Sequence, residues 1–206
     1  MVRGSDLTPM WLPPLRLLWH GARPSAEELH AFARDASDHA KRCSYPGSVD
    51  SLPKERLWFV NRADRRIGRG RRDYERASEA LGSLDCLELT WLMHCAHADS
   101  LAICSRQFGC VWLMNANRII SRENDRSNGG RRRSITWATT QRHVLCGEER
   151  VSVVWDAATD DVRFQVLSFS RPRHLYSWAA YPYVLAQQRR FARDAAEAMR
   201  AKVGDA

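Results

Sequence analysis

The sequence predicts an α+β fold in which a long C-terminal helix covers one face of an antiparallel sheet. Six or so strand-like segments follow one another between about residues 87 and 169, with short polar turns between them, which is typical of an antiparallel meander. A last segment, from about Pro182 to Lys202, carries an apolar stripe at helical spacing. A meander has to bury one face, and the closing helix is the natural cover.

Length and composition are those of one globular domain. The 206 residues are 44% hydrophobic and 27% charged, and a chain of this length can bury a large core. No stretch approaches the roughly 18 consecutive apolar residues that a membrane-spanning helix needs. The segment Met1–Asp6 lacks the apolar centre of a signal peptide. We therefore expect a cytoplasmic protein without a transmembrane segment.

The N-terminal region is predicted to contain an arm and a helix. Residues 1–24 are rich in proline and have no steady period, so we expect an irregular arm whose apolar stretch, Trp11–Trp19, packs on the body or on a partner. Ser25-Ala26-Glu27-Glu28 has the pattern of a capping box, which predicts the start of a helix. An apolar face follows at helical spacing, and Pro46 in the segment Cys43–Gly47 marks the end.

A strand, a turn and a second helix are expected next. The strand is predicted near Arg56–Arg62, the turn at Gly68-Arg69-Gly70, and the helix from about Arg71 to Leu81, with Gly82 closing it. The glycine-rich turn lacks the residues of a Walker motif and the further glycine of a dinucleotide-binding loop. We therefore interpret it as a turn between a strand and a helix, in preference to a phosphate loop.

Alternation and polar turns predict the strands that follow. Between Leu87 and Cys95, apolar residues alternate with Glu88, Thr90, Leu92 and His94, the pattern of a half-buried strand. Further strands are expected around 100–107, 110–115, 117–123, 133–140, 149–156 and 162–169, with turns at 96–100, 124–130 and 156–161.

The cysteines and histidines allow several kinds of site. The cysteines are Cys43, Cys86, Cys95, Cys104, Cys110 and Cys146. Most lie in apolar runs and the chain shows no export signal, so we expect reduced core thiols in preference to disulfides. The set His94, Cys95, His97, His143 and Cys146 lacks the regular spacing of zinc ligands. We expect no metal and no cofactor; a nucleophilic Cys146–His143 dyad is a less favoured alternative.

The formal net charge of +8 comes mainly from arginines. They gather between Arg62 and Arg76 and again at Arg131-Arg132-Arg133. Such clusters attract nucleic acid or anionic membranes, but no recognised nucleic-acid-binding module accompanies them. We favour a solvated surface and regard nucleic acid as an unfavoured partner.

Short polar motifs recur in a fixed order along the chain. They are Ile67-Gly68-Arg69-Gly70 running into Tyr74 and Ala77, Trp112 followed by Asn117-Arg118-Ile119-Ile120, His143-Val144-Leu145-Cys146-Gly147-Glu148-Glu149-Arg150, Phe169-Ser170-Arg171-Pro172, Tyr181-Pro182 and Gln188-Arg189-Arg190-Phe191. In this order and spacing, the chain resembles the uncharacterised protein family 0548, also described as domain of unknown function 1990, from about residue 43 to residue 191. The family has no established activity, so the resemblance implies a fold and candidate positions only.

The order of elements also resembles the helix-grip fold of the START and Bet v 1 superfamily, in which a curved sheet wraps a long helix around an apolar cavity. We therefore expect residues 43–206 to form a single helix-grip-like domain, with an N-terminal arm and helix, residues 1–42, packed on it. Trp137 and Arg142 stand where family members have smaller residues, and we expect both near the mouth of the cavity.

The Gly147-Glu148-Glu149 segment gives the most specific structural prediction. Glu149 shares the parity of Val151 and Val153, so it is expected to face the core while Glu148 points outward. A buried carboxylate needs a partner, and Arg118 or Arg171 is expected to supply it. We interpret such a pair first as an ion pair that fixes the register at the rim of the sheet, and second as a pair that contacts a ligand.

We expect the protein to bind a small apolar or amphipathic ligand in a cavity between the sheet and the C-terminal helix. The candidate ligand-binding residues are Trp112, Arg118, Trp137, His143, Glu149 and Arg171. One alternative is an enzyme that uses Glu149, His143 and Arg171 in the same cavity. Another is polyanion binding through the arginine clusters. The sequence assigns neither catalytic residues nor an oligomeric state.

Overall fold

A computed structural model describes residues 19–45, 47–54, 57–127 and 129–204. Its antiparallel sheet has the strand order β2-β8-β7-β6-β5-β4-β3, and the short strand β1 pairs with β5. The strands are β1 (Trp19–His20), β2 (Phe59–Arg69), β3 (Leu92–His97), β4 (Ser100–Gln107), β5 (Val111–Ser127), β6 (Gly130–Thr139), β7 (Leu145–Asp156) and β8 (Asp161–Pro172). From β3 to β8, strands that are neighbours in the sheet are also consecutive in the chain, which is the predicted meander.

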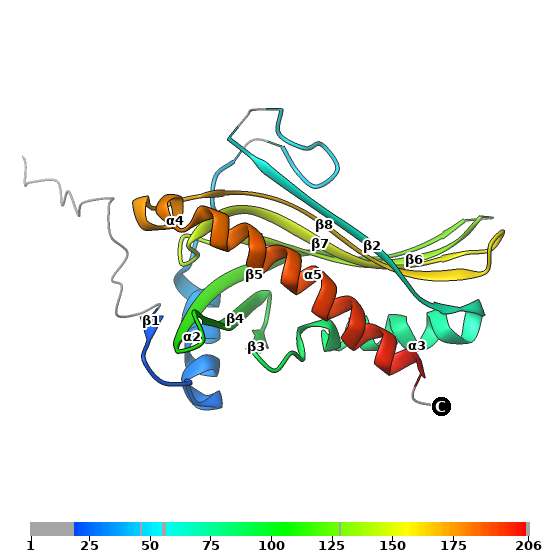
Figure 1. Ribbon diagram of the computed structural model, residues 1–206, viewed down its shortest axis with the longest axis horizontal. Helices are drawn as coiled ribbons and strands as arrows, with labels where there is room; N and C mark the ends of the chain where they lie inside the picture. The colour runs from blue at the N-terminus through cyan, green and yellow to red at the C-terminus, as the bar shows by residue number, and fades with distance from the viewer. Residues whose placement is uncertain (1–18, 46, 55–56, 128, 205–206) are drawn as a thin grey trace, which may run out of the picture.

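The long C-terminal helix α5 (Tyr181–Gly204) crosses one face of this curved sheet diagonally (Figure 1). Its stripe of buried residues packs against the apolar side chains of β6, β7 and β8. This main core includes Ile135, Val151, Val153, Phe164, Val166, Phe191, Ala195 and Met199. A curved antiparallel sheet closed by a C-terminal helix confirms the predicted helix-grip architecture.

The other face of the sheet is covered by the helix α2 (Ala26–His39), which packs on β3, β4 and β5. The capping box is present as predicted: the Ser25 hydroxyl accepts from the Glu28 amide, and the Glu28 carboxylate accepts from the Ser25 amide. Leu29, Phe32 and Ala33 form a second core with Trp112 and other residues of the sheet. Both faces of these strands are therefore buried.

A third, smaller core lies under the loop between α2 and β2. Trp58 and Tyr45 make edge contacts with Phe169 of β8, with ring centroids 5.4 Å and 5.5 Å apart. Cys43, Val49 and Cys146 complete this cluster. The loop therefore covers the outer face of β7 and β8, a point that decides the environment of Glu148.

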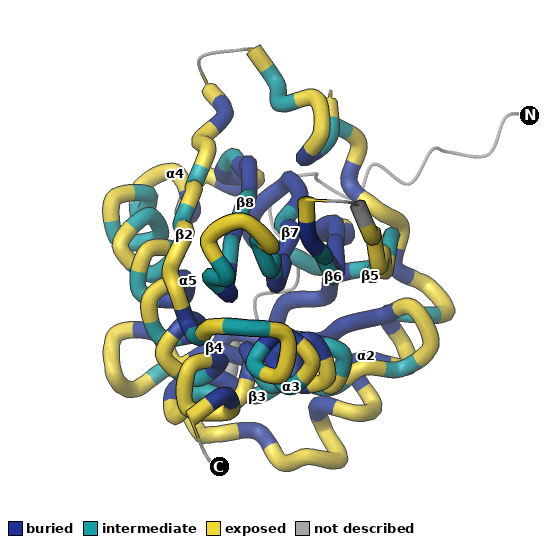
Figure 2. Tube along the Cα trace, turned by 90° about the vertical axis from the view of Figure 1, so that its right-hand side faces the viewer, coloured by how far each residue is buried: buried dark blue, intermediate teal, exposed yellow. Residues whose placement is uncertain are grey.

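The helix α3 (Gly70–Gly82) follows β2 and packs against α5, β6 and β7. Gly70 has φ +82°, a conformation that glycine adopts without strain, and it joins the strand directly to the helix. This confirms the predicted turn and helix, although β2 runs on through Gly68. The strand itself is largely exposed at the edge of the sheet (Figure 2).

Three predicted boundaries were wrong. Residues 85–87 form a short 3-10 helix, η1 (Asp85–Leu87), and β3 begins only at Leu92. The two strands predicted around 110–123 are one strand, β5, interrupted by a register shift between Ile119 and Ser121. The turn predicted at 124–130 is shorter, because β5 continues to Ser127. In the last two cases strand pairing across the sheet overrides the local pattern.

The short helix α4 (Leu175–Ala179) links β8 to α5. The predicted arm falls largely on residues 1–18, and with Pro46 and Arg56 these lie outside the described residues. In the described part of the chain, no helix has both the length and the apolar character needed to cross a membrane.

Candidate functional site

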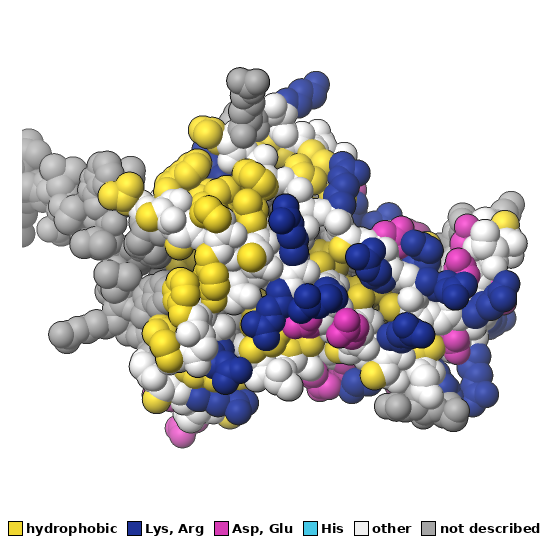
Figure 3. Space-filling view, in the orientation of Figure 1, with side chains coloured by type: hydrophobic (Ala, Val, Ile, Leu, Met, Phe, Trp, Pro, Cys, Tyr) yellow, Lys and Arg dark blue, Asp and Glu magenta, His cyan; other side chains and the backbone are white. Residues whose placement is uncertain are grey.

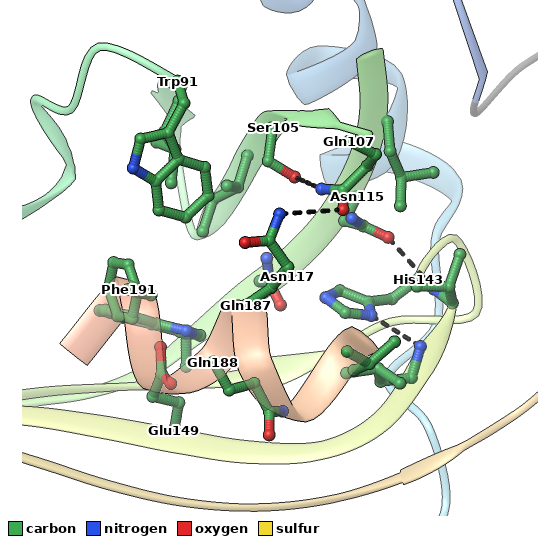
Figure 4. Close-up of a pocket in the computed structure, with 17 residues that line it drawn as sticks. Trp91, Ser105, Gln107, Asn115, Asn117, His143, Glu149, Gln187, Gln188 and Phe191 are labelled. Atoms are coloured by element: carbon green, nitrogen blue, oxygen red, sulfur yellow. Dashed lines mark hydrogen bonds between the residues drawn. The ribbon is translucent and has the colours of Figure 1, made fainter. Parts of the chain in front are cut away.

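A cavity of about 190 Å³ lies between the inner face of the sheet and the N-terminal half of α5. Strands β3 to β7 and the loop between β6 and β7 form its walls, and α5 closes it (Figure 4). The lining residues are Trp91, Leu92, Ile103, Ser105, Gln107, Leu113, Asn115, Asn117, Trp137, His143, Val144, Leu145, Glu149, Val184, Gln187, Gln188 and Phe191. Almost half of these side chains are polar, so the cavity is amphipathic where the sequence predicts an apolar one.

Five carboxamide side chains define the polar part of the cavity. They are Gln107, Asn115, Asn117, Gln187 and Gln188. Each carboxamide carries both donors and an acceptor. Asparagine is depleted in strands, yet two of these residues lie two positions apart on β5 and face the cavity side by side.

Hydrogen bonds hold several of these amides in place. Gln107 donates to the Ser105 hydroxyl (2.6 Å), and Gln187 donates to the hydroxyl of Tyr183 (2.8 Å). Gln188 reaches across to β8 and donates to the Ser170 hydroxyl (2.9 Å). The polar wall is therefore built before any ligand binds, and side chains that are already positioned lose less entropy when they bind one.

His143 lies in the loop between β6 and β7, with its ring at the cavity. Its Nδ1 accepts a hydrogen bond from the Leu145 amide (2.9 Å), so the neutral ring carries its proton on Nε2. The nitrogen that does not make this bond points into the cavity (Figure 4). Burial lowers the pKa of His143 to about 3, and the positive charge of Arg173 acts in the same direction. At neutral pH this residue therefore offers the cavity a neutral N–H donor.

Glu149 projects from β7 at the opposite end of the polar wall. Burial raises its pKa to about 7, partly offset by hydrogen bonding from the side chains of Trp137 and Ser168. These residues are its direct neighbours on β6 and β8. Of these two side chains, Trp137 has the larger effect. The result is a carboxyl group that exchanges its proton near neutral pH.

A recess of about 70 Å³ adjoins the cavity beneath Glu149. Trp137, His143 and Glu149 line both spaces, while Ser168 and Ser170 of β8 line only the recess. The recess extends the cavity toward its most polar end.

The structure brings three of the six predicted site residues together. Trp137, His143 and Glu149 line the cavity. Trp137 is only 3% exposed, so it forms an inner wall and not the predicted mouth. Arg142, the other residue expected at the mouth, forms an ion pair with Asp35 of α2.

The other three predicted residues lie on the opposite face of the sheet. Trp112 packs in the core beneath α2. Arg118 donates to the carbonyl oxygen of Ser37 (3.1 Å) and pairs with Asp99 (3.2 Å). Arg171 lies over the ring of Trp58, 4.8 Å from its centroid. Trp112 and Arg118 have the parity opposite to that of Asn115 and Asn117, so strand geometry excludes them from the cavity.

The predicted pairing of Glu149 with Arg118 or Arg171 was therefore wrong, although Glu149 does face inward. Glu148 points to the opposite face, as expected, but the loop before β2 covers that face and leaves the residue 5% exposed. Its carboxylate accepts from the Tyr45 hydroxyl (2.7 Å) and from the Val49 amide (3.0 Å). It is a buried anchor for the loop, not a surface residue.

The carboxamides and Ser105 were not predicted as site residues. A signal for some of them was present: Asn117 and Gln188 both lie in the family motifs, and Gln188 is on the apolar stripe of α5. Polar residues at positions that periodicity assigns to the inside indicate a site. Gln107 and Gln187 carry no such signal, because only the tertiary structure brings them together.

The described residues contain no cluster of three or more histidine, cysteine or acidic side chains arranged to hold a metal ion. His143 lines the inner cavity, whereas Cys146 belongs to the core under the loop on the other face. The two residues are thus not arranged as a nucleophilic dyad.

Several solved structures are similar to the chain at low sequence identity. Protein TTHA0849 from Thermus thermophilus is 9% identical over 70% of this chain and 96% of that chain, with a TM-score of 0.49. Norcoclaurine synthase from Thalictrum flavum is 10% identical over 73% of this chain and 96% of its own, with a TM-score of 0.44. Ara h 8.0201 is 8% identical over 71% and 97%, also with a TM-score of 0.44.

Two relatives share more sequence. A UPF0548 protein of Arabidopsis thaliana is 28% identical over 149 residues, which cover 69% of this chain and 72% of the relative. A UPF0548 protein of Dictyostelium discoideum is 28% identical over 193 residues, 86% of this chain and 87% of the relative. The model of the family described as "Domain of unknown function (DUF1990)" matches residues 39–198. The chain therefore belongs to the DUF1990 family, as its motifs predicted.

Proposed function

We propose that this protein binds a small, uncharged, amphipathic molecule in the cavity between the sheet and α5. The observation that carries the proposal is the composition of the cavity wall. Aromatic and aliphatic side chains such as Trp91 and Phe191 form one part, and fixed carboxamides form the other. Binding sites for small molecules typically combine an apolar surface with a few convergent polar groups.

The charges around the cavity favour a neutral ligand. None of the described lining residues is a lysine or an arginine. His143 is uncharged at neutral pH. Glu149 has a pKa of about 7, so it is fully ionised only at a higher pH. A fatty-acid carboxylate would meet no cation here and would be repelled by Glu149 once that residue ionises. Hydroxyl or amide groups, in contrast, match the five carboxamides and the imidazole N–H.

The size of the cavity favours a compact ligand. A dry cavity of about 150 Å³ accommodates a benzene molecule. The cavity of about 190 Å³, together with its recess of about 70 Å³, therefore suits a ligand of one or two rings. If a ligand ring packs against Trp91 and Phe191, its polar substituents can face the carboxamide side chains.

Thermal-shift screening of the full chain tests this proposal. The panel contains hydroxylated or amide-bearing mono- and bicyclic aromatics, saturated fatty acids and linear isoprenoids. We expect the neutral aromatics to raise the melting temperature and the fatty acids to leave it unchanged. Stabilisation by fatty acids alone would contradict the neutral-ligand proposal.

Two variants on α5 assign the binding to this cavity. Val184 lines the cavity, whereas Ala186 lies two residues further along the same helix and is exposed. Val184→Phe fills part of the cavity and should abolish the shift. Ala186→Phe adds a ring on the solvent side and should preserve it. Equal binding by both variants would place the ligand elsewhere.

A second candidate function, acid–base catalysis on the bound molecule, rests on Glu149. Its pKa of about 7 is that of a group able to give and take a proton at neutral pH, and it shares the cavity with the N–H donor of His143. Once a ligand is found, mass spectrometry would show whether the protein converts it. If the protein is a catalyst, Glu149→Gln should still bind the ligand but no longer convert it. Recovery of the ligand without chemical change would show that the protein binds it and does not catalyse a reaction.

A further inference from the structure

A second cavity, of about 460 Å³, lies on the outer face of the sheet, beside the end of β8. Two cysteines, Cys43 and Cys146, line it together with the arginines Arg171 and Arg173. It is separate from the cavity under α5, since the two share no lining residue. The cysteines are 7% and 5% exposed, so each presents only a small surface to this space.

Backbone pairing sets the positions of the two cysteines. The segment before Cys43 pairs with the end of β6: the Cys43 amide donates to the Thr139 carbonyl (3.0 Å), and the Gln141 amide donates to the Lys41 carbonyl (2.8 Å). Cys146 lies on β7, the strand next to β6. Residues about a hundred positions apart in sequence therefore meet at one edge of the cavity.

The two thiols line the same cavity, and each makes a hydrogen bond with the neighbouring backbone. The Cys43 thiol donates to the carbonyl oxygen of Thr140 (3.0 Å). Arg173 Nη1 donates to Cys43 Sγ (3.5 Å), and the Cys146 thiol donates to the carbonyl oxygen of Ser44, the neighbour of Cys43 (3.7 Å). Arg173 thus brings a hydrogen-bond donor and a positive charge to the Cys43 sulfur, and both favour the thiolate once the proton held toward Thr140 is lost.

The two thiols have opposite acidities. The neighbouring Cys146 side chain and the positive charge of Arg173 lower the pKa of Cys43 below its ordinary value despite burial. The neighbouring Cys43 and burial raise the pKa of Cys146. Burial also raises the pKa of Cys104, even though the positive charge of Arg23 acts in the opposite direction. Cys43 is thus distinguished from the structural cysteines of the core.

We propose that Cys43 and Cys146 form a peroxide-reactive dithiol, in which Cys43 is the attacking thiolate and Cys146 the thiol that resolves the product. The ligand class is a small hydroperoxide that enters from the outer cavity. Arg173 acts as a positioning residue for the thiolate. The site is independent of the proposed ligand cavity, so either proposal can fail without the other.

The chemistry has two steps. In the first step, the Cys43 thiolate attacks the terminal oxygen of the hydroperoxide and the O–O bond breaks. Cys43 becomes a sulfenic acid, and the alkoxide that leaves takes a proton from water. In the second step, the sulfur of Cys146 attacks the sulfur of the sulfenic acid and the S–O bond breaks. The hydroxyl group leaves as water, together with the proton of the Cys146 thiol. The hydroperoxide is reduced to an alcohol, or to water if it is hydrogen peroxide, and the two thiols are oxidised to one disulfide.

Treatment of the full chain with hydrogen peroxide, followed by alkylation and peptide mapping, tests the first part of the proposal. We expect a peptide in which Cys43 is joined to Cys146, and an intact mass lowered by two hydrogen atoms. Cys110 is exposed and free, so it is the internal control. At pH 7 Cys43 should react roughly 10-fold faster than Cys110, because the Arg173 guanidinium favours the thiolate of Cys43, which is the reactive form.

Variants separate the roles of the residues. Cys146→Ser should leave a sulfenic acid on Cys43 that a 1,3-diketone reagent traps, while Cys110→Ser should still form the disulfide. Arg173→Gln should slow alkylation of Cys43 and move its pH profile to higher pH without changing the circular dichroism. A purely structural arginine would not shift that profile.

Two results would overturn the proposal, and neither depends on a variant folding. One is oxidation of Cys110 in the wild-type chain while Cys43 and Cys146 stay alkylatable. The other is a pH profile for Cys43 alkylation that inflects at or above the ordinary thiol value of about 8.5.

Discussion

At the scale of single residues, two adjacent glutamates show how strand geometry assigns different chemistry to neighbours in sequence. Glu149 points toward the cavity under α5, where burial raises its pKa to about 7. Glu148 points to the opposite face and anchors the loop before β2 through Tyr45 and Val49. Successive side chains of a strand face opposite ways, so one carboxylate serves the cavity and the other the fold.

Glu149→Gln should change how the stability of the protein depends on pH. The unfolded chain loses this proton near the ordinary pKa of 4.5, whereas the folded protein keeps it up to about 7. Stability is therefore lost as the pH rises from about 4.5 to about 7, on the order of 3 kcal/mol at about 1.4 kcal/mol per pKa unit. Glutamine cannot ionise, so the variant should be more stable than wild type at pH 8 and similar at pH 4.

Urea unfolding at pH values between 4 and 8 measures this effect. The difference between variant and wild type should grow through the window and level off above it. Parallel stability curves for the two proteins would show that Glu149 does not titrate with a raised pKa.

Glu148→Ala should destabilise the protein, although the residue points away from the main core. The substitution leaves the Tyr45 hydroxyl and the Val49 amide without their shared acceptor. Hydrogen bonds to a charged group contribute about 1.5–3 kcal/mol, and we expect a loss in free energy of unfolding of about 2–3 kcal/mol. Glu197→Ala, at an exposed position of α5, is the matched control and should change stability by less than about 0.5 kcal/mol. Equal effects of the two substitutions would refute the anchoring role.

At the scale of elements, the close approach of β7 and β8 explains one glycine of the family motif. Gly147 has φ +156°, and a side chain there would collide with the carbonyl oxygen of Phe169. The Thr139 side chain bridges to the same glycine, accepting from its amide (2.9 Å) and donating to its carbonyl (3.2 Å). The strands can only meet this closely where no Cβ intervenes.

Gly147→Ala should therefore be strongly destabilising, by about 3 kcal/mol or more, since strain and a backbone collision add. Gly21→Ala is the control, because nothing lies within 4 Å of an added Cβ at that position. Circular dichroism melts of both variants would test this, and near-normal stability of Gly147→Ala would mean that the two strands readily separate.

At the scale of the whole molecule, charge is distributed differently from what the arginine clusters suggest. On the face seen in Figure 3, acidic side chains lie among the basic ones over much of the surface. Arg71 and Arg131 both pair with Glu75, at 2.8 Å and 3.7 Å, and Arg163 pairs with Asp64 at 2.8 Å. Part of the positive charge is thus neutralised locally.

We therefore expect only weak binding of random-sequence nucleic acid, although the net charge is +8. Fluorescence anisotropy at low salt should detect some association, and it should disappear near 0.15 M salt, where charges are screened beyond about 8 Å. Tight binding that persists at 0.15 M salt would instead support the polyanion hypothesis.

Much of this architecture could be predicted from the sequence, because the patterns that specify it lie within short segments of the chain. The capping box at Ser25, the helix after Gly70 and the stripe of α5 each reflect interactions within a few residues, and the structure confirms them. Alternation in β7 likewise placed Glu149 inward. The order of these elements and their motifs was sufficient to predict both the helix-grip architecture and the family.

The composition of the site was decided by tertiary structure. On β5 both faces are buried, one by α2 and the other by the cavity, so alternation between apolar and polar residues is lost and the inner face could not be recognised. The family motif pointed to Trp112, whereas the inner positions are Asn115 and Asn117. The same reason explains Glu148: its outward direction was predictable, but the loop that covers it comes from a hundred residues away. Parity along a strand is encoded locally, whereas what covers each face is decided only when distant segments pack together.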